Sequence, residues 1–277
     1  RDAQESRGLG DVYKRQLYNR TTDPRHKELV KEYFTLLKNS GFLKQQTMQQ
    51  YCSISADGVT KFLPDRYVEG DCPICGSEGA RGDQCDNCGK TLDSKELKNP
   101  RSKLNPDAKI EFRETEHLFF KLSEFRDPLL EWLSSGKDHW RSSVINFTRN
   151  WLQEGLIDRP ITRDLEWGID IQREGYEKKR MYVWFEAVMG YYSASLHWAK
   201  NEGKPDLWKD WWENDSAEHY YFMAKDNIPF HTIIWPAMLS GCGLHLPHDV
   251  PANEYLLLDS TQFSNCLLYT SPSPRDS

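Results

Sequence analysis

The sequence lacks several features that would assign it to a class directly. No apolar run approaches the roughly 18 residues of a membrane-spanning helix, which excludes a helical membrane protein. Sustained heptads and repeats of solenoid length are also absent, which excludes coiled coils and repeat arrays. The net charge is only -6. Overall electrostatics therefore do not indicate nucleic-acid binding, although a local basic groove is compatible with this total.

Aromatic residues are abundant and make up 13% of the 277 residues. Disordered chains lack such apolar surface, so we predict a folded protein with the length of about two domains. Of the 7 cysteines, several stand in two close pairs and the others are scattered. This distribution favours a metal site in a reducing cytoplasm over a disulfide framework, and we therefore predict a cytoplasmic protein.

The two ends of the chain can be related through one DNA sequence. ESRGLGDVYKRQ at residues 5–16 and CLLYTSPSPRDS at residues 266–277 can be encoded by the two strands of a single short DNA sequence, which resembles a sequencing adapter. A basic signal segment is the alternative for the first end, but this stretch has no apolar core. We therefore interpret residues 1–16 and 266–277 as adapter-like scars and expect a longer parent protein.

Helical and strand patterns alternate between these ends. A cap at Asp23, Pro24 in the first turn and apolar spacing predict a helix that Gly41 stops. Apolar spacing also predicts helices from Asp127 onward and from about Asp138 to Glu154. Short aromatic or branched runs predict strands at residues 181–185, 220–223 and 254–258. This alternation favours an α/β sheet, in which the carboxyl ends of parallel strands form the ligand crevice.

The strongest chemical signal is a C-x2-C-x9-C-x2-C pattern formed by Cys72, Cys75, Cys85 and Cys88. Two such turns supply four thiolates to one tetrahedral ion, which leaves no position open for water and indicates a structural zinc site. An iron site of the rubredoxin type uses the same ligands and is the chemical alternative. A redox C-x-x-C motif would not explain the second pair. The pattern predicts a metal but says little about function.

Later segments combine aromatic and charged residues. In FMAKDNIPFH, Asp226 and His231 would lie beside an aromatic-lined hollow that suits a small, partly apolar ligand with a ribose hydroxyl. His245 and His248 are interpreted as part of an ordinary turn rather than a second metal site, because their spacing is atypical for ligands.

Two further polar segments are given structural interpretations. Glu114, Glu116 and His117 resemble a catalytic trio, but ETEHLFF is better explained as a strand with its polar residues turned outward. The basic run from Lys178 to Arg180 is interpreted as a solvated turn, with contact to an RNA backbone as the alternative.

Four ordered segments resemble the methionyl-tRNA synthetases, a family of class I aminoacyl-tRNA synthetases. They are FLPDRYVEGDCPICG, ITRDLEWGI, YVWFEAVMGYY and FMAKDNIPFHTIIWPAML, and the resemblance covers residues 17–265. Leucyl, isoleucyl and valyl enzymes are similar at ITRDLEWG. They carry a much larger editing insertion, however, and fit the Trp-x-x-Ala-x-x-x-Tyr pattern less well.

The resemblance implies an α/β fold, namely a split Rossmann-like catalytic domain with a zinc-knuckle connective insertion. Residues 17–48 would end its first half, residues 49–160 would form the insertion, and residues 161–265 would form its second half. The family activates methionine with ATP and Mg2+ to methionyl-adenylate and then charges tRNA(Met). The expected partners are therefore methionine, ATP and tRNA(Met), and the expected structural metal is Zn2+.

Site residues are carried over by position from the same resemblance. Lys225 and Asp226 would bind ATP, with Asp226 accepting hydrogen bonds from the ribose hydroxyls. The residues that would hold methionine are Trp184, Ala187, Val188, Tyr191, Phe230, His231 and Arg163. Val188 replaces the proline of some family members. Taken alone, Trp184 and Tyr191 would be ordinary core aromatics and Asp226 an ordinary helix cap.

Two signatures of the family are incomplete. The His-Ile-Gly-His block belongs upstream of Leu17, and the Lys-Met-Ser-Lys-Ser loop begins near Gln262, Phe263 and Ser264 before the second scar interrupts it. We therefore assign no catalytic residue and expect the chain by itself to be inactive. The alternative is a non-catalytic zinc-ribbon module, such as a synthetase-like RNA-binding or regulatory protein.

Overall fold

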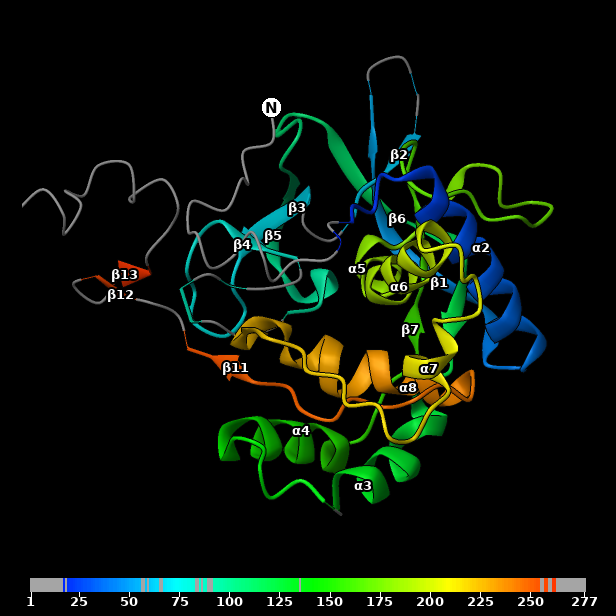
Figure 1. Cartoon of the computed structure of the whole chain (residues 1–277). Helices are drawn as coiled ribbons and strands as arrows, with labels where there is room; N and C mark the ends of the chain where they lie inside the picture. The colour runs from blue at the N-terminus through cyan, green and yellow to red at the C-terminus, as the bar shows by residue number, and fades with distance from the viewer. Residues whose placement is uncertain are drawn as a thin grey trace, which may run out of the picture. The chain divides into compact units, whose positions relative to one another are not determined.

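In the computed structural model the chain forms two compact units. Figure 1 shows its helices and strands. Unit 1 combines residues 1–40, 122–157 and 187–277, and unit 2 combines residues 41–121 and 158–186. The structure describes residues 17, 19–55, 58, 60–64, 67–82, 85, 87–88, 92–134 and 136–254, with the backbone of 257–258 and 261–262. No helix in these ranges has the length and apolarity to cross a membrane.

Unit 1 is mainly helical. Its helical segments are α2 (Pro24–Asn39), η3 (Leu122–Phe125), α3 (Arg126–Ser134), α4 (Ser142–Glu154), α6 (Gly190–Asn201), α7 (Lys209–Trp212), η4 (Lys225–Asn227), the π-helical η5 (Phe230–Ile234) and α8 (Trp235–Gly241). Its strands are β10 (Met223–Ala224), β11 (Ala252–Asn253), β12 (Leu257–Leu258) and β13 (Thr261–Gln262).

Helix α2 begins where the sequence predicts. Asp23 has extended backbone and its carboxylate accepts a hydrogen bond from the Arg25 N–H, while Pro24 occupies the first turn, where no N–H is needed. The helix ends before Gly41, whose φ of +80° is accessible to glycine at little cost. Its buried face consists of His26, Leu29, Val30, Tyr33, Phe34 and Leu37.

The core of unit 1 surrounds the continuous segment η5–α8. Trp235 is fully buried, and the Tyr33 hydroxyl of α2 donates to the Met238 carbonyl at 2.8 Å. On α4, the hydroxyl of Thr148 lies 2.9 Å from that of Thr232. Helices α2 and α4 are thus both tied to η5–α8, which fixes the turn that carries His231.

The described parallel pairing lies in unit 1, where Met223 of β10 is opposite Ala252 of β11. Of the strand predicted at 220–223, only Met223 belongs to a strand, β10, while Tyr220 forms an isolated bridge with Asp249. Of the strand predicted at 254–258, Leu257 and Leu258 form β12, and β11 precedes Glu254. The third predicted helix also begins later, at Ser142. Trp140 instead closes a turn on the Lys137 carbonyl.

Unit 2 contains most of the sheet structure. Its strands are β1 (Leu43–Ile54), β2 (Thr60–Phe62), β3 (Val68–Asp71), β4 (Ala80–Arg81), β5 (Lys98–Ser102), β6 (Lys109–Phe120), β7 (Arg159–Pro160), β8 (Thr162–Asp164) and β9 (Lys179–Met181), with η2 (Ser94–Glu96) and α5 (Val183–Ala187) as its short helices. The longest strands, β1 and β6, pair antiparallel from Leu43↔Phe120 to Ile54↔Lys109 (Figure 1).

Three sheets of unit 2 follow from these pairings. The main sheet has the order β2-β1-β6-β7, a second has the order β4-β3-β5, and β8 and β9 form a hairpin. The strand predicted at residues 181–185 is wrong beyond Met181, because Val183 starts α5. Phe185 of that helix is buried and lies against Phe120, with 5.7 Å between the ring centroids.

Gly168, in the connection between β8 and β9, has a backbone conformation that other residues rarely adopt. Its φ is +140°, and an added Cβ would lie 2.9 Å from the Cβ of Arg180. Gly175, in the same connection, has φ +81° but open space around it.

We expect Gly168→Ala to destabilise the chain more than Gly175→Ala. Both variants incur the cost of a left-handed conformation, about 1–2 kcal/mol, but only the first adds a steric clash. Urea unfolding midpoints of the two variants measure the difference. Equal midpoints would contradict the role assigned to the Arg180 contact.

Candidate metal centre and substrate site

The four predicted cysteine ligands lie together in unit 2. The Sγ atoms of Cys72 and Cys88 are 3.9 Å apart, those of Cys75 and Cys85 are 3.7 Å apart, and all four lie within 4.8 Å of one another. Tetrahedral coordination with Zn–S bonds of about 2.3 Å requires sulfur separations of about 3.8 Å. Two of the sulfur pairs therefore already have the spacing that a zinc ion needs, and all four sulfur atoms are close enough to share one ion.

Local backbone structure positions the first pair of cysteines. The chain turns directly after β3, where the Cys72 N–H bonds to the Ser77 carbonyl and the Gly76 N–H bonds to the Cys72 carbonyl. Cys72 and Cys85 are almost fully buried, and they pack in an apolar cluster with Leu63 and Val68. The cysteines thus belong to the core of the small sheet, which is consistent with a structural ion.

Hydrogen bonds to Cys75 favour its thiolate form. Hydrogen bonds from the backbone of Ser77 and the side chain of Asn87 lower the pKa of Cys75 to about 6. Thiolates are the form that binds zinc. Among the described residues, these cysteines are the one group of His, Cys, Asp and Glu side chains close enough to share an ion.

We expect the purified chain to contain about one zinc ion, and Cys85→Ser to lower that content, because a closed tetrahedral site needs all four thiolates. Metal analysis by mass spectrometry measures the content. Cys242→Ser is the matched control, since Cys242 lies outside the cluster. An unchanged zinc content in Cys85→Ser would refute the ligand assignment.

Two of the predicted methionine-site residues meet directly in unit 1. The Tyr191 hydroxyl of α6 lies 2.8 Å from His231 Nε2 of η5. His231 Nδ1 lies 3.0 Å from the Asn227 carbonyl, which only accepts, so Nδ1 carries the ring hydrogen and Nε2 accepts from Tyr191. Burial lowers the pKa of His231 and raises that of Tyr191. The pair is therefore neutral at neutral pH.

The neighbouring predicted residues differ in exposure. Val188 is buried and Ala187 and Phe230 are half-buried in unit 1, whereas Trp184 belongs to unit 2 and is exposed. The ring of Tyr191 also meets that of Tyr221 edge to face, with 4.9 Å between centroids. Within unit 1, the pair thus has an uncharged, largely aromatic setting, which suits an apolar ligand.

Lys225 and Asp226 follow the end of parallel strand β10, as the sequence predicts for groups at a ligand crevice. Both are exposed, and Lys225 forms an ion pair with Glu254, which follows β11. Asp226 lies within η4 and accepts a hydrogen bond from the side chain of Asn227 at 3.1 Å, so it is not a helix cap. Gln262 is the last residue of β13. Phe263 and Ser264 lie outside the described residues.

Arg163 lies on β8 in unit 2. Its Nη1 donates to the carbonyls of Pro160 at 2.8 Å and Thr162 at 2.9 Å. Its guanidinium also lies over the ring of Tyr182, 4.2 Å from the centroid. Tyr182 directly precedes α5, which carries Trp184. Arg163 and the start of α5 are therefore in contact through Tyr182.

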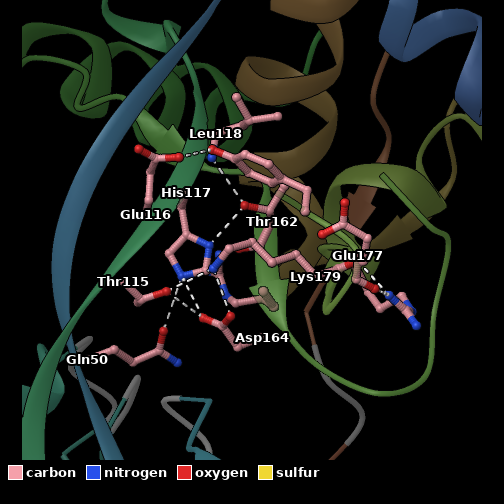
Figure 2. A network of polar contacts seen from close by, with 12 residues as sticks. Gln50, Thr115, Glu116, His117, Leu118, Thr162, Asp164, Glu177 and Lys179 are labelled. Carbon is pink, nitrogen blue, oxygen red and sulfur yellow. Dashed lines mark hydrogen bonds and ion pairs between the residues drawn. The ribbon is translucent and has the colours of Figure 1, made fainter. Parts of the chain in front are cut away.

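A buried polar network lies beside Arg163 and was not predicted (Figure 2). The carboxylate of Asp164 on β8 accepts from Lys179 on β9 at 2.7 Å and from Thr115 on β6 at 2.9 Å, and it lies 3.2 Å from His117 Nε2. His117 is fully buried, and Lys179 is 8% exposed.

These positions correct two interpretations of the sequence. ETEHLFF is part of a strand, but Thr115 and His117 point inward rather than outward, and Lys179 is in a buried strand position rather than a solvated turn. The sequence feature that could have indicated burial here is the continuous apolar run from Leu118 to Phe120, because such a run is typical of a strand end that is covered on both faces.

Burial by itself would raise the pKa of Asp164, but hydrogen bonds from His117 and Lys179 outweigh it and bring the pKa to about 2. A carboxylate with a depressed pKa stabilises the fold above its unfolded pKa of 3.8, and this contribution is lost as the pH falls through the folded pKa. The contribution amounts to about 2 kcal/mol.

We therefore expect the stability difference between the wild-type chain and Asp164→Asn to shrink when the pH falls from 5 to about 2, because protonation leaves the wild-type side chain uncharged as well. Urea unfolding at several pH values measures this. Asp170→Asn, which removes an exposed partner of Arg180, should show a small difference throughout. A constant gap for Asp164→Asn would contradict the depressed pKa.

The known proteins that this chain resembles belong to one family. The family described as "tRNA synthetases class I (M)" matches residues 12–269. A methionine–tRNA ligase of Dehalococcoides mccartyi strain CBDB1 is 54% identical over 249 residues, which cover 89% of this chain and 44% of that protein. A methionine–tRNA ligase of Thermoplasma volcanium is 50% identical over 250 residues, covering 90% and 45%.

Solved structures show a similar fold. Mycobacterium tuberculosis methionyl-tRNA synthetase bound by methionyl-adenylate aligns with a TM-score of 0.60 at 20% identity, covering 91% of this chain and 42% of that one. The free form of the same enzyme aligns with a TM-score of 0.55 at 20% identity, covering 87% and 41%. The α/β fold class expected from the sequence is thereby confirmed. The chain spans less than half the length of these relatives.

Proposed function

Because the chain belongs to the methionyl-tRNA synthetase family of class I tRNA synthetases, we propose that it is part of a cytoplasmic methionine–tRNA ligase. In this proposal, residues 17–48 and 161–265 contribute to the nucleotide-binding fold, and residues 49–160 form its zinc-bearing insertion. The parent enzyme joins methionine to ATP and then charges tRNA(Met). The observation that carries the substrate assignment is the hydrogen bond between Tyr191 and His231.

The neutral Tyr191–His231 pair favours a methionine side chain over a charged one. A charged side chain would lose its hydration in this half-buried aromatic setting without gaining an opposite charge from the pair. A thioether is apolar and polarisable, and it packs well against aromatic edges such as those of Tyr191 and Phe230. Val188, Ala187, Trp184 and Arg163 complete the proposed binding residues.

The proposed reaction needs positioning more than a protein nucleophile. A methionine carboxylate oxygen attacks the α-phosphorus of ATP and pyrophosphate leaves; a terminal ribose hydroxyl of tRNA then attacks the acyl carbon and AMP leaves. Lys225 would neutralise phosphate charge, and Asp226 would accept hydrogen bonds from the ribose hydroxyls. Mg2+ would accompany ATP, and Zn2+ at the cysteine site would stabilise the insertion.

We expect the complete gene product to catalyse methionine-dependent exchange between ATP and pyrophosphate, and the chain by itself to remain at background. His231→Ala should raise the KM for methionine by about tenfold, the cost of one buried hydrogen-bonded group, with little change in the KM for ATP. Exchange assays measure both constants.

His245→Ala is the matched control, because His245 lies outside the proposed site. Exchange by the chain alone well above background would contradict its expected inactivity. A complete gene product without methionine-dependent exchange would overturn the proposed function, and so would flanking sequence that lacks the family signatures on both sides.

A further inference from the structure

The polar network of unit 2 joins strands that are distant in the sequence (Figure 2). Gln50 comes from β1, Thr115 and His117 from β6, Thr162 and Asp164 from β8, and Lys179 from β9. Sequence separations of 64 residues between Thr115 and Lys179 and 49 between Thr115 and Asp164 make these long-range contacts. The network therefore ties the β8–β9 hairpin to the main sheet.

The neighbouring donors and acceptors determine which ring nitrogen of His117 carries the hydrogen. His117 Nε2 faces two acceptors, Asp164 Oδ2 at 3.2 Å and Gln50 Oε1 at 3.4 Å, so this nitrogen carries the ring hydrogen. Nδ1 then accepts from the Thr162 hydroxyl at 2.9 Å, and that hydroxyl in turn accepts from the Leu118 N–H at 3.1 Å. His117 is thus neutral, which agrees with the lowering of its pKa by burial.

The charges of the network balance as well. Lys179 Nζ donates to Asp164 Oδ1 at 2.7 Å and to the Thr115 hydroxyl at 2.8 Å, and that hydroxyl donates to Asp164 Oδ2. One buried carboxylate therefore meets one buried ammonium group beside a neutral histidine. Removal of any one member leaves a buried polar group without its partner.

The backbone ladder of the hairpin is short, and an isolated bridge between Asp170 and Arg180 adds to it. Strands β8 and β9 pair over Thr162↔Met181, Arg163↔Arg180 and Asp164↔Lys179. A ladder this short is marginal by itself, and the central pair places two like charges opposite each other. The attractive pair Asp164–Lys179 at the next position therefore favours this alignment of β8 with β9.

Side chains alternate between the two faces of β8, so the register of β8 with β9 also determines where Arg163 lies. Asp164 points into the network, so Arg163 points to the opposite face of the strand. There its guanidinium lies over Tyr182, which continues from β9 and whose N–H bonds to the Ile161 carbonyl at 2.8 Å. The stacking of Arg163 on Tyr182 therefore depends on the same register that Asp164 and Lys179 set.

We propose that the Asp164–Lys179–Thr115–His117 network is the positioning device for Arg163 and Tyr182, and through them for the start of α5 at Trp184. In this proposal its members act on the substrate site only through Arg163 and Tyr182. This inference rests on the proposed function in one respect, namely that Arg163 and Trp184 face methionine. The position of Arg163 itself can be measured in the chain without any substrate.

The first experiment follows the guanidinium of Arg163 by NMR in the zinc-loaded chain. In the wild type, the Nε–H resonance of Arg163 should carry the ring-current shift of Tyr182. Asp164→Asn should abolish most of this shift, whereas Asp170→Asn, which alters an exposed ion pair of the same region, should preserve it. A folded Asp164→Asn chain with an unchanged Arg163 resonance would overturn the proposal.

A more conservative pair of variants tests the proposal if Asp164→Asn does not fold. Thr115→Val keeps the shape of the side chain but removes the hydroxyl that links Lys179 to Asp164, and Thr115→Ser keeps the hydroxyl. We expect Thr115→Val to reduce the ring-current shift of Arg163 and Thr115→Ser to retain it. Equal shifts in the two variants would count against the network.

The second experiment uses the complete gene product. Thr115→Val should raise the KM for methionine by about tenfold with a much smaller change in kcat and in the KM for ATP, and Thr115→Ser should restore it. An unchanged KM despite a displaced Arg163 would refute the positioning role. A wild-type enzyme without methionine-dependent exchange would refute the proposed function instead, while the NMR result on the chain would still decide the network.

Discussion

The buried carboxylate of Asp164 is the constraint on which the organisation of unit 2 depends. A charge with only 16% of its side chain exposed is tolerated because Lys179, Thr115 and His117 surround it with hydrogen-bond donors. These partners come from two strands other than its own, so the carboxylate is satisfied only when both are in register. Because of this requirement, the β8–β9 hairpin, which has only three paired positions, is attached to the main sheet in a defined register.

The cysteine cluster imposes a comparable constraint on the smaller sheet. Strands β3, β4 and β5 are short, and the apolar cluster beneath them includes Cys72 and Cys85 themselves. A sheet of this size buries little surface, so a metal that binds four thiolates would supply much of the free energy that orders it. Cys72 and Cys85 are buried whereas Cys75 is exposed, so the cluster lies at the edge of that core. An ion bound here would therefore have a structural rather than a catalytic setting.

The proposed substrate site relies on a different principle. Tyr191 and His231 are linked by a hydrogen bond, and burial keeps both neutral, so selectivity would come from shape and polarisability rather than charge. His231 lies on a π-helical turn, a local widening of the helix that is frequent at functional sites. Charged groups are found instead at the exposed end of β10, where Lys225 and Asp226 are the proposed contacts to the phosphates and ribose of ATP.

The sequence by itself determined the features that depend on local spacing. Two C-x2-C turns specify a tetrahedral site, and the cap at Asp23 with Pro24 specifies the start of α2, because each needs only neighbouring residues. Only the tertiary structure decided that His117 and Lys179 are buried, that Val183 starts a helix, and that Tyr191 meets His231. Amphipathic periodicity shows that a strand has two faces but not what covers each face. That depends on contacts between residues 40 to 67 positions apart, such as Tyr191 with His231 and Gln50 with His117, which no local pattern encodes.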